Sequence, residues 1–163
     1  MKVLVLYYSL SGNTKKLAEA VAEGVRDGGA EPVLRSAEEV TKEEFAEAAG
    51  IIAGSPVYFG TMAWQLKKVF DEFVGLRRQG KTENKIGAAF ATSGNGTGGK
   101  ETTIFSIIKA LMIYGCIIVG DPMEATGHYG VGCVGAPDEL ARANAGKLGK
   151  RVALLAGRLG EAP

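Results

Sequence analysis

Stretches of continuous apolar residues alternate along the chain with stretches in which apolar residues recur every three or four positions. The continuous runs indicate strands buried on both faces, and the periodic stretches indicate amphipathic helices. Strands are expected at residues 2–8, 31–35, 50–55, 85–91 and 116–119. Helices are expected at 13–26 and 41–49, through Leu66 to about Leu76, and at 100–114 and 137–159. We therefore predict one α/β domain over residues 1–163, with a five-stranded, doubly wound parallel sheet between two helical layers.

Local signals mark the ends of several of these helices. Thr41, with Glu44 three residues later, has the spacing of a capping box. Pro137 is expected at the first position of the last helix, with Asp138 and Glu139 in its first turn.

Residues 8–15 leave the first predicted strand and enter the first predicted helix. The first N–H groups of a helix have no intrahelical partner, and the helix dipole adds partial positive charge there. Ser9, Ser11, Asn13 and Thr14 add side-chain donors at the same place, and no basic residue lies in the middle of the loop. Neutral dipoles of this kind favour a bound phosphate monoester. The alternative is an ordinary helix cap made by Ser11 or Asn13.

Three predicted strands end in segments rich in hydroxyl, glycine and aromatic residues, at 9–14, 56–60 and 92–99. The carboxyl ends of parallel strands share one edge of the sheet, which is where ligands of such folds bind. The second segment offers aromatic faces at Tyr58 and Phe59, and the third offers hydroxyls and bare backbone. A phosphate joined to a planar ring fits all three segments, and flavin mononucleotide (FMN) is such a ligand. Because the flavin carries the redox chemistry itself, we expect no catalytic residue from the protein.

Composition narrows the class of protein. The chain has 19 basic and 18 acidic residues, a balance that argues against a nucleic-acid surface. One histidine and two cysteines without ligand spacing argue against a metal site. The longest apolar region is interrupted by Lys109 and Gly115, so no membrane span is expected. We expect a cytoplasmic protein with reduced thiols.

Residues 94–99 also match the dinucleotide motif G-x-G-x-x-G, with Asp121 at about the distance of a ribose-binding acid. A dinucleotide unit normally begins its domain, however, and three strand–helix units precede this one. The same stretch has the spacing of a P-loop through Lys100, but Glu101 stands at the Ser/Thr position and would repel phosphate. His128 lies in a glycine-rich segment, where a solvated histidine is favoured over one that reaches the flavin edge.

Residues 6–14, 54–62 and 98–103 resemble the flavodoxin-fold proteins of the WrbA type, which are multimeric NAD(P)H:quinone oxidoreductases. The most specific piece of the match is Pro56-x-x-Phe59-Gly60-x-Met62. Tyr129-Gly130 and the Gly-Ala-Pro-Asp run that starts at Gly135 extend the match over nearly the whole chain. The resemblance implies the flavodoxin-like strand order 2-1-3-4-5.

The resemblance also implies which residues bind FMN. The phosphate would be held by Ser9, Leu10, Ser11, Gly12, Asn13 and Thr14. The ring would be held by the other two segments: Pro56, Val57, Tyr58, Phe59, Gly60, Thr92, Ser93, Gly94, Asn95, Gly96, Thr97 and Gly98.

Two positions depart from the family pattern. Tyr114 stands where these reductases carry a histidine that reaches the ring from a neighbouring subunit, and Arg77 stands where they carry a ring-facing tryptophan. With His128, these residues are candidates for the substrate pocket. The chain is shorter than the family norm after the second strand and at residues 121–127, which are regions that help to build the tetramer. We expect a homo-dimer or homo-tetramer with an apolar subunit face near Trp64.

Two functions fit these observations. The first is hydride transfer from NAD(P)H to FMN, followed by two-electron reduction of a quinone. The second is a flavodoxin-type carrier that shuttles single electrons between redox proteins. The net charge of +1 and a third loop without an aromatic residue favour the enzyme, because carrier flavodoxins are acidic and commonly flank the ring there. The departures at Arg77 and Tyr114 and the missing insertions favour the carrier. A flavin-sensing protein without turnover is a third reading.

Overall fold

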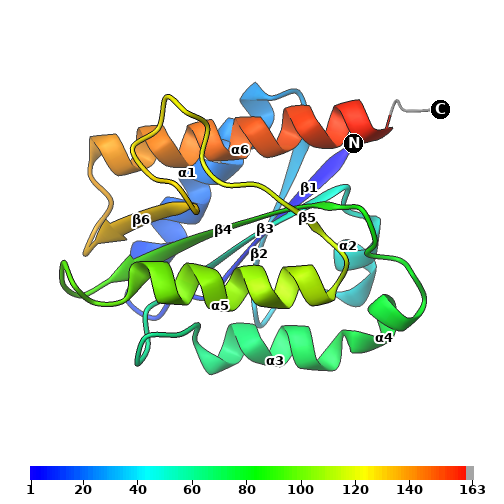
Figure 1. Cartoon of the computed structure of the whole chain (residues 1–163), viewed down its shortest axis with the longest axis horizontal. Coiled ribbons are helices and arrows are strands. Elements are labelled where there is room, and N and C mark those ends of the chain that lie inside the picture. The colour runs from blue at the N-terminus through cyan, green and yellow to red at the C-terminus, as the bar shows by residue number, and fades with distance from the viewer. Residues whose placement is uncertain (161–163) are drawn as a thin grey trace.

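The computed structural model describes residues 1–160, which form a parallel sheet between two layers of helices (Figure 1). The strands are β1 (Lys2–Tyr7), β2 (Glu31–Ser36), β3 (Gly50–Pro56), β4 (Ile86–Ser93), β5 (Ile117–Ile118) and β6 (Val131–Val134). The helices are α1 (Asn13–Asp27), α2 (Lys42–Glu47), α3 (Trp64–Glu72), α4 (Val74–Arg78), α5 (Lys100–Ile113) and α6 (Glu139–Gly160).

The strands follow the order β2-β1-β3-β4-β5, and every pair is parallel. This confirms the predicted class and order. The sheet also has a sixth strand, β6, which the prediction of five strands did not include. β5 pairs with Ile86 and Gly87 at the start of β4, and β6 pairs with residues 90–93 at its end. Two short strands therefore share the edge position beside β4, and the segment between them leaves the sheet.

The apolar strands are buried on both faces because each face is covered by helices. On β1, Val3 and Val5 pack toward α1 and α6, whereas Leu4 and Leu6 pack toward α2, α3 and α5. All four side chains are fully buried, which stabilises the fold by about 1.5–3 kcal/mol each. This double burial explains why the first strand shows no alternation of apolar and polar residues.

Helices α1 and α6 cross in close contact on one face of the sheet (Figure 1). A Cβ atom added to Gly24 of α1 would lie 1.9 Å from the carbonyl oxygen of Gly146 in α6. Only glycine fits at such a distance, so the close crossing depends on Gly24.

The helix ends agree with the sequence signals except at α6 and α3. The capping box is present, since Thr41 Oγ1 accepts a hydrogen bond from Glu44 N and Glu44 Oε2 accepts one from Thr41 N. The prediction for Pro137 is wrong, because α6 begins at Glu139 and Asp138 caps it by accepting a hydrogen bond from Ala141 N at 2.8 Å. The helix expected through Leu66 is divided into α3 and α4.

Within residues 1–160, the helices are all too short or too polar to cross a lipid bilayer.

Candidate cofactor site

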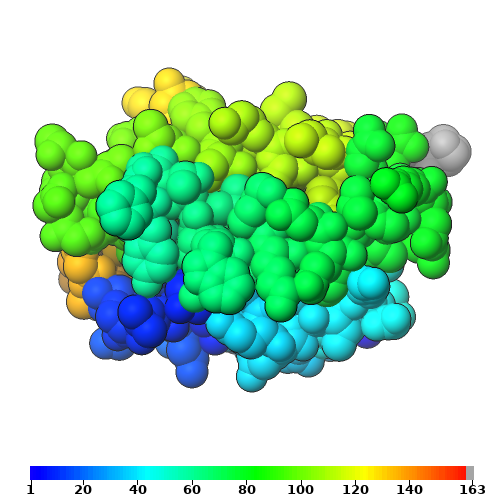
Figure 2. All heavy atoms as spheres, turned by 90° about the horizontal axis from the view of Figure 1, so that it is seen from below, coloured from blue at the N-terminus to red at the C-terminus, as the bar shows by residue number. Residues whose placement is uncertain are grey.

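The segments that follow β1, β3 and β4 lie together at one edge of the sheet. The strands end side by side, with Tyr7 opposite Gly54 and Pro56 opposite Thr92. Figure 2 shows the first segment in dark blue, the second in blue-green and the third in light green, gathered at the left end of the molecule. The parallel sheet thus brings the three predicted segments to a common edge.

Direct contacts join these segments in pairs. The hydroxyl oxygens of Thr14 and Thr92 are 2.8 Å apart and buried, so the start of α1 is tied to the end of β4. The rings of Tyr8 and Tyr58 meet edge to face at 6.4 Å between centroids. The third segment packs against the second so closely that a Cβ atom on Gly99 would lie 3.3 Å from the Cα atom of Gly60.

The start of α1 is open to an anion. Its N-cap residue is Gly12, with φ of 89°, and no side chain makes a capping hydrogen bond there. The alternative of a cap made by Ser11 or Asn13 is therefore wrong. Ser9 Oγ accepts a hydrogen bond from Gly12 N at 3.1 Å and orders the loop. The first-turn N–H groups carry partial positive charge without a side-chain acceptor, which suits a phosphate.

The second segment projects an aromatic ring into solvent. Tyr58 and Thr61 exchange two backbone hydrogen bonds of 3.1 Å, and Phe59 and Gly60 between them have φ of 51° and 78°. Two positive φ values in a two-residue turn correspond to type I′ geometry. For a residue other than glycine, the left-handed conformation costs about 1–2 kcal/mol. Phe59 is also fully exposed. Strain combined with apolar exposure indicates a contact surface at Phe59.

Two serine hydroxyls hold the backbone that follows the turn of the second segment. Ser55 Oγ accepts a hydrogen bond from Ala63 N at 2.8 Å, and Ser106 Oγ of α5 accepts one from Met62 N at 3.0 Å. Sequence reasoning missed both serines. Ser106 could have been noticed in the sequence, because it is a polar residue within the apolar pattern of α5. Burial raises the pKa of Tyr58 and nearby Tyr8 raises it further, so the phenol stays protonated.

The third segment is mostly exposed backbone. Ser93 Oγ donates to Asn95 O at 2.7 Å, and Gly98 N donates to the same oxygen at 3.2 Å. A Cβ atom on Gly98 would lie 2.9 Å from that of Ser93, so this turn requires glycine. Gly94 and Gly96 leave open space beside the backbone, where a planar ring could approach.

The dinucleotide and P-loop alternatives do not fit this geometry. Asp121 is buried next to a separate cavity between α5, β6 and α6, which none of residues 94–99 lines. Lys100 Nζ is bound to the carbonyl oxygen of Gly96 at 3.0 Å, so it braces the loop from within.

The candidate substrate residues are not brought to this edge within the chain. Tyr114 is 4% exposed and its hydroxyl donates to Phe70 O at 2.5 Å, at the far end of α5. Burial, with Asp71 and Cys116 nearby, raises the pKa of Tyr114 to about 12. Within its own chain the ring of Tyr114 is therefore part of the core, away from the three segments, and its place in a substrate pocket stays a prediction.

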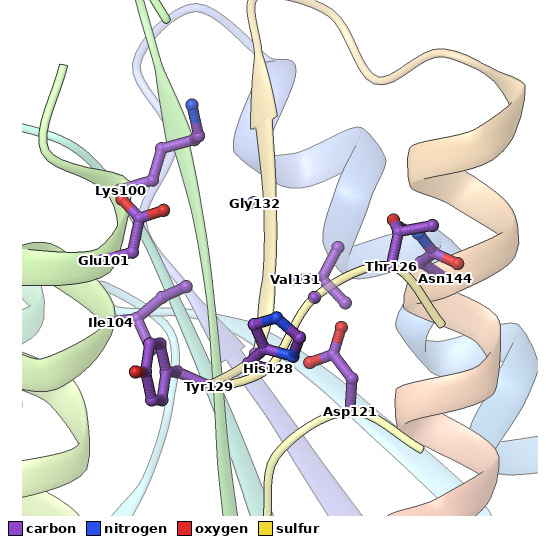
Figure 3. Close-up of a pocket in the computed structure, with 12 residues that line it drawn as sticks. Lys100, Glu101, Ile104, Asp121, Thr126, His128, Tyr129, Val131, Gly132 and Asn144 are labelled. Carbon is purple, nitrogen blue, oxygen red and sulfur yellow. Dashed lines mark hydrogen bonds between the residues drawn. The ribbon is translucent and has the colours of Figure 1, made fainter. Parts of the chain in front are cut away.

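Arg77 and His128 also lie apart from the three segments. Arg77 Nε donates to the carbonyl oxygen of Ile113 at 2.6 Å, at the same end of α5 as Tyr114. His128 is exposed and lines the separate cavity beyond β6, as Figure 3 shows. Within residues 1–160, no group of three or more His, Cys, Asp or Glu side chains is arranged to hold a metal ion.

Comparison with known proteins agrees with the fold and the motifs. Residues 5–112 match the sequence profile of the flavodoxin family. A flavodoxin from Aquifex aeolicus is 39% identical over 158 residues, covering 93% of this chain and 85% of that protein. An NAD(P)H dehydrogenase (quinone) from Archaeoglobus fulgidus is 36% identical over 188 residues, covering 97% of this chain and 98% of that protein.

Among solved structures, the flavodoxin, WrbA-like protein from Agrobacterium tumefaciens superposes with a TM-score of 0.84 at 25% identity. The match covers 96% of this chain and 98% of that one. The resemblance to WrbA-type proteins that the motifs predicted is confirmed. This chain belongs to the flavodoxin family.

Proposed function

We propose that this protein binds FMN across the three strand-end segments and uses it to reduce a quinone with two electrons from NAD(P)H. The observation that carries the proposal is the convergence of an uncapped helix start, an exposed aromatic turn and a bare glycine loop on one edge. When bound, FMN supplies a ring that accepts hydride and passes on two electrons.

The first segment would hold the phosphate. The N–H groups at the start of α1 and the side chains of Ser9, Ser11 and Asn13 can donate to its oxygens. The hydroxyl of Thr14 is already paired with Thr92, so Thr14 would contribute its backbone N–H. Neutral donors together with the helix dipole fit a permanently bound monoester.

The other two segments would hold the ring. Phe59 can cover one face of the ring. This contact would bury its exposed side chain and offset the free-energy cost of its left-handed backbone. Backbone N–H groups of residues 94–97 can donate to the polar edge of the ring, where they would favour negative charge.

The names of several relatives support the choice of reaction. The relative from Archaeoglobus fulgidus and one from Methylocella silvestris, at 36% and 35% identity over 97% of this chain, are NAD(P)H dehydrogenases (quinone). Both alignments also cover 98% of the relative, so nearly the full length of each relative is matched.

Steady-state kinetics test this proposal. The chain, saturated with FMN, is assayed for oxidation of NADH and NADPH with a benzoquinone as acceptor. Phe59→Ala should lower kcat/KM by about 2- to 12-fold, which is the worth of one aromatic stacking contact. Met112→Ala, a matched exposed apolar residue near the far end of α5, should have no effect.

Absence of turnover with both nicotinamides, in a protein that holds FMN, would refute the proposed quinone reductase activity. That outcome supports the alternative of an electron carrier. Two observations favour the alternative. The residues at the departing pocket positions, Tyr114 and Arg77, lie away from the site. Leu10 and Phe59, on two of the three segments, are exposed apolar residues suited to contact with a protein partner. A carrier would still take up two electrons per FMN in a reductive titration.

A further inference from the structure

A separate cavity lies between α5, β6 and α6, at the edge of the sheet (Figure 3). Its volume is about 210 Å³, which is several times the space that one water molecule occupies. Its walls come from the start of α5, from residues 126–132 and from Asn144 of α6. None of the residues predicted to bind FMN lines it, so it is not part of the cofactor site.

A buried carboxylate without a partner faces this cavity. Asp121 is 7% exposed, and neither of its carboxylate oxygens accepts a hydrogen bond from any group in residues 1–160. Figure 3 shows the carboxylate pointing into the space between His128 and Thr126. A buried charge is expensive unless it is paired, so the position favours a partner from outside the chain, such as ordered water or a cation.

The charged groups around Asp121 do not fill this need. The guanidinium of Arg151 in α6 donates hydrogen bonds to the backbone oxygens of Gly120 and Asp121. Lys100 of α5 points away to Gly96 O. His128 forms no ion pair with the carboxylate among the described residues. The backbone of Gly127 packs so tightly that a Cβ atom there would lie 2.2 Å from Asp121 Oδ2, which holds the carboxylate in place.

Burial raises the pKa of Asp121. The amide groups of Asp121 and Gly127, together with His128 and Arg151, lower it by less, and neither amide reaches hydrogen-bond geometry. The carboxylate is therefore under-stabilised in the free protein, and a bound positive charge would relieve this.

The rest of the wall suits the apolar part of a small molecule. Tyr129 presents an aromatic ring, and Ile104 and Val131 present aliphatic groups. Asn144 Nδ2 already donates to Thr126 Oγ1 at 2.7 Å, so that pair closes one side. An anionic floor with aromatic and aliphatic walls is the pattern that recognises organic ammonium groups.

We propose that this cavity binds a small organic cation, a primary alkylammonium, whose N–H groups donate to the carboxylate of Asp121. Its alkyl chain lies against Val131, Ile104 and the ring of Tyr129. The proposal does not depend on the function of the cofactor edge.

Titration of the purified full-length chain with n-propylammonium chloride tests this, followed by the backbone amide resonances of Gly127 and Gly130. The expected result is a saturable shift with a millimolar Kd, and no saturable shift with n-propanol, which has the same shape without the charge. Asp121→Asn should weaken binding at least about tenfold. Glu31→Gln, which neutralises an exposed carboxylate on β2, should bind as the wild type does.

Shifts that grow without saturation, or that persist unchanged in Asp121→Asn, would overturn the proposal and leave ordered water as the only occupant. If Asp121→Asn does not fold, Tyr129→Leu replaces it, because Tyr129 is half-exposed and tolerant of change. This variant should weaken binding about two- to fivefold by removing the aromatic contact, and unchanged binding would count against the site.

The pH dependence in the wild type gives an independent readout. Binding should weaken as the pH falls and Asp121 takes up a proton. Lys100, Glu101 and His128 also line the cavity, Arg151 lies near Asp121, and a positive charge on His128 would repel the cation as well. The loss at low pH should therefore persist in His128→Asn. Binding that is independent of pH in this variant would exclude Asp121 as the acceptor.

Discussion

The hydrogen bond between Thr14 and Thr92 is the contact that ties the predicted phosphate loop to the predicted ring loop. Its hydroxyl oxygens are 2.8 Å apart, and the two residues are 2% and 5% exposed. Thr14→Val keeps the shape of the side chain and leaves the Thr92 hydroxyl buried without its partner. Such a group costs about 1–3 kcal/mol, so the free energy of unfolding should fall by that amount. Thr14→Val/Thr92→Val should recover most of the loss, because neither hydroxyl is then left unpaired.

The same change should weaken FMN binding about fivefold or more, because the start of α1 is no longer held against the end of β4. Thr82→Val is the matched control. Thr82 is fully buried and donates to Tyr114 O at 2.7 Å, at the opposite edge of the sheet. It should cost comparable stability and leave the FMN Kd within about twofold. Urea unfolding and flavin fluorescence titration measure the two quantities. If Thr14→Val and Thr82→Val affect FMN affinity equally, the positioning argument fails.

Three further predictions concern other residues. Phe59→Gly should be at least as stable as the wild type in urea, because it relieves a left-handed backbone with φ of 51°, yet should bind FMN about 2- to 12-fold more weakly; a loss of stability without a loss of affinity would contradict this. Tyr114→Phe should lower the free energy of unfolding by about 1 kcal/mol, through loss of its bond to Phe70 O, and should leave the quinone KM unchanged; a changed KM would support the pocket role. Burial raises the pKa of Asp121 above 3.8, so the folded chain keeps this proton to higher pH than the unfolded chain does, and the free energy of unfolding should fall as the pH rises from about 4. Asp121→Asn should make this fall shallower. Urea unfolding from pH 4 to pH 7 measures it, and an unchanged slope in the variant would refute the assignment.

The convergence of the three segments could be predicted because it depends only on strand polarity. Once residues 2–8, 50–55 and 85–91 read as buried parallel strands, their carboxyl ends must share an edge. Hydrogen bonds between residues close in the sequence could also be predicted, as in the capping box of Thr41 and Glu44.

Contacts between residues far apart in the sequence could not be predicted from the pattern of apolar and polar positions. The pair Thr14 and Thr92 is separated by 78 residues, and nothing local distinguishes either hydroxyl from a phosphate ligand. β6 has only four residues with a glycine among them, so it is fixed by its pairing with β4 and not by its own propensity.

Burial decides the cases of Tyr114 and Asp121. The family pattern placed Tyr114 at a pocket position, but packing against Phe45 and Phe70 turns its ring into the core. Asp121 could be read as a ribose-binding acid from spacing alone, whereas the fold encloses it in a cavity of its own. In both cases the sequence gives the residue type but not its neighbours.

Titration of the apoprotein with FMN and with riboflavin, followed by flavin fluorescence, tests the central claim most directly. The account predicts quenching that saturates at one FMN per chain, with riboflavin at least about tenfold weaker because it lacks the phosphate that the start of α1 would hold. Equal affinity for the two flavins, or no quenching by either, would contradict it.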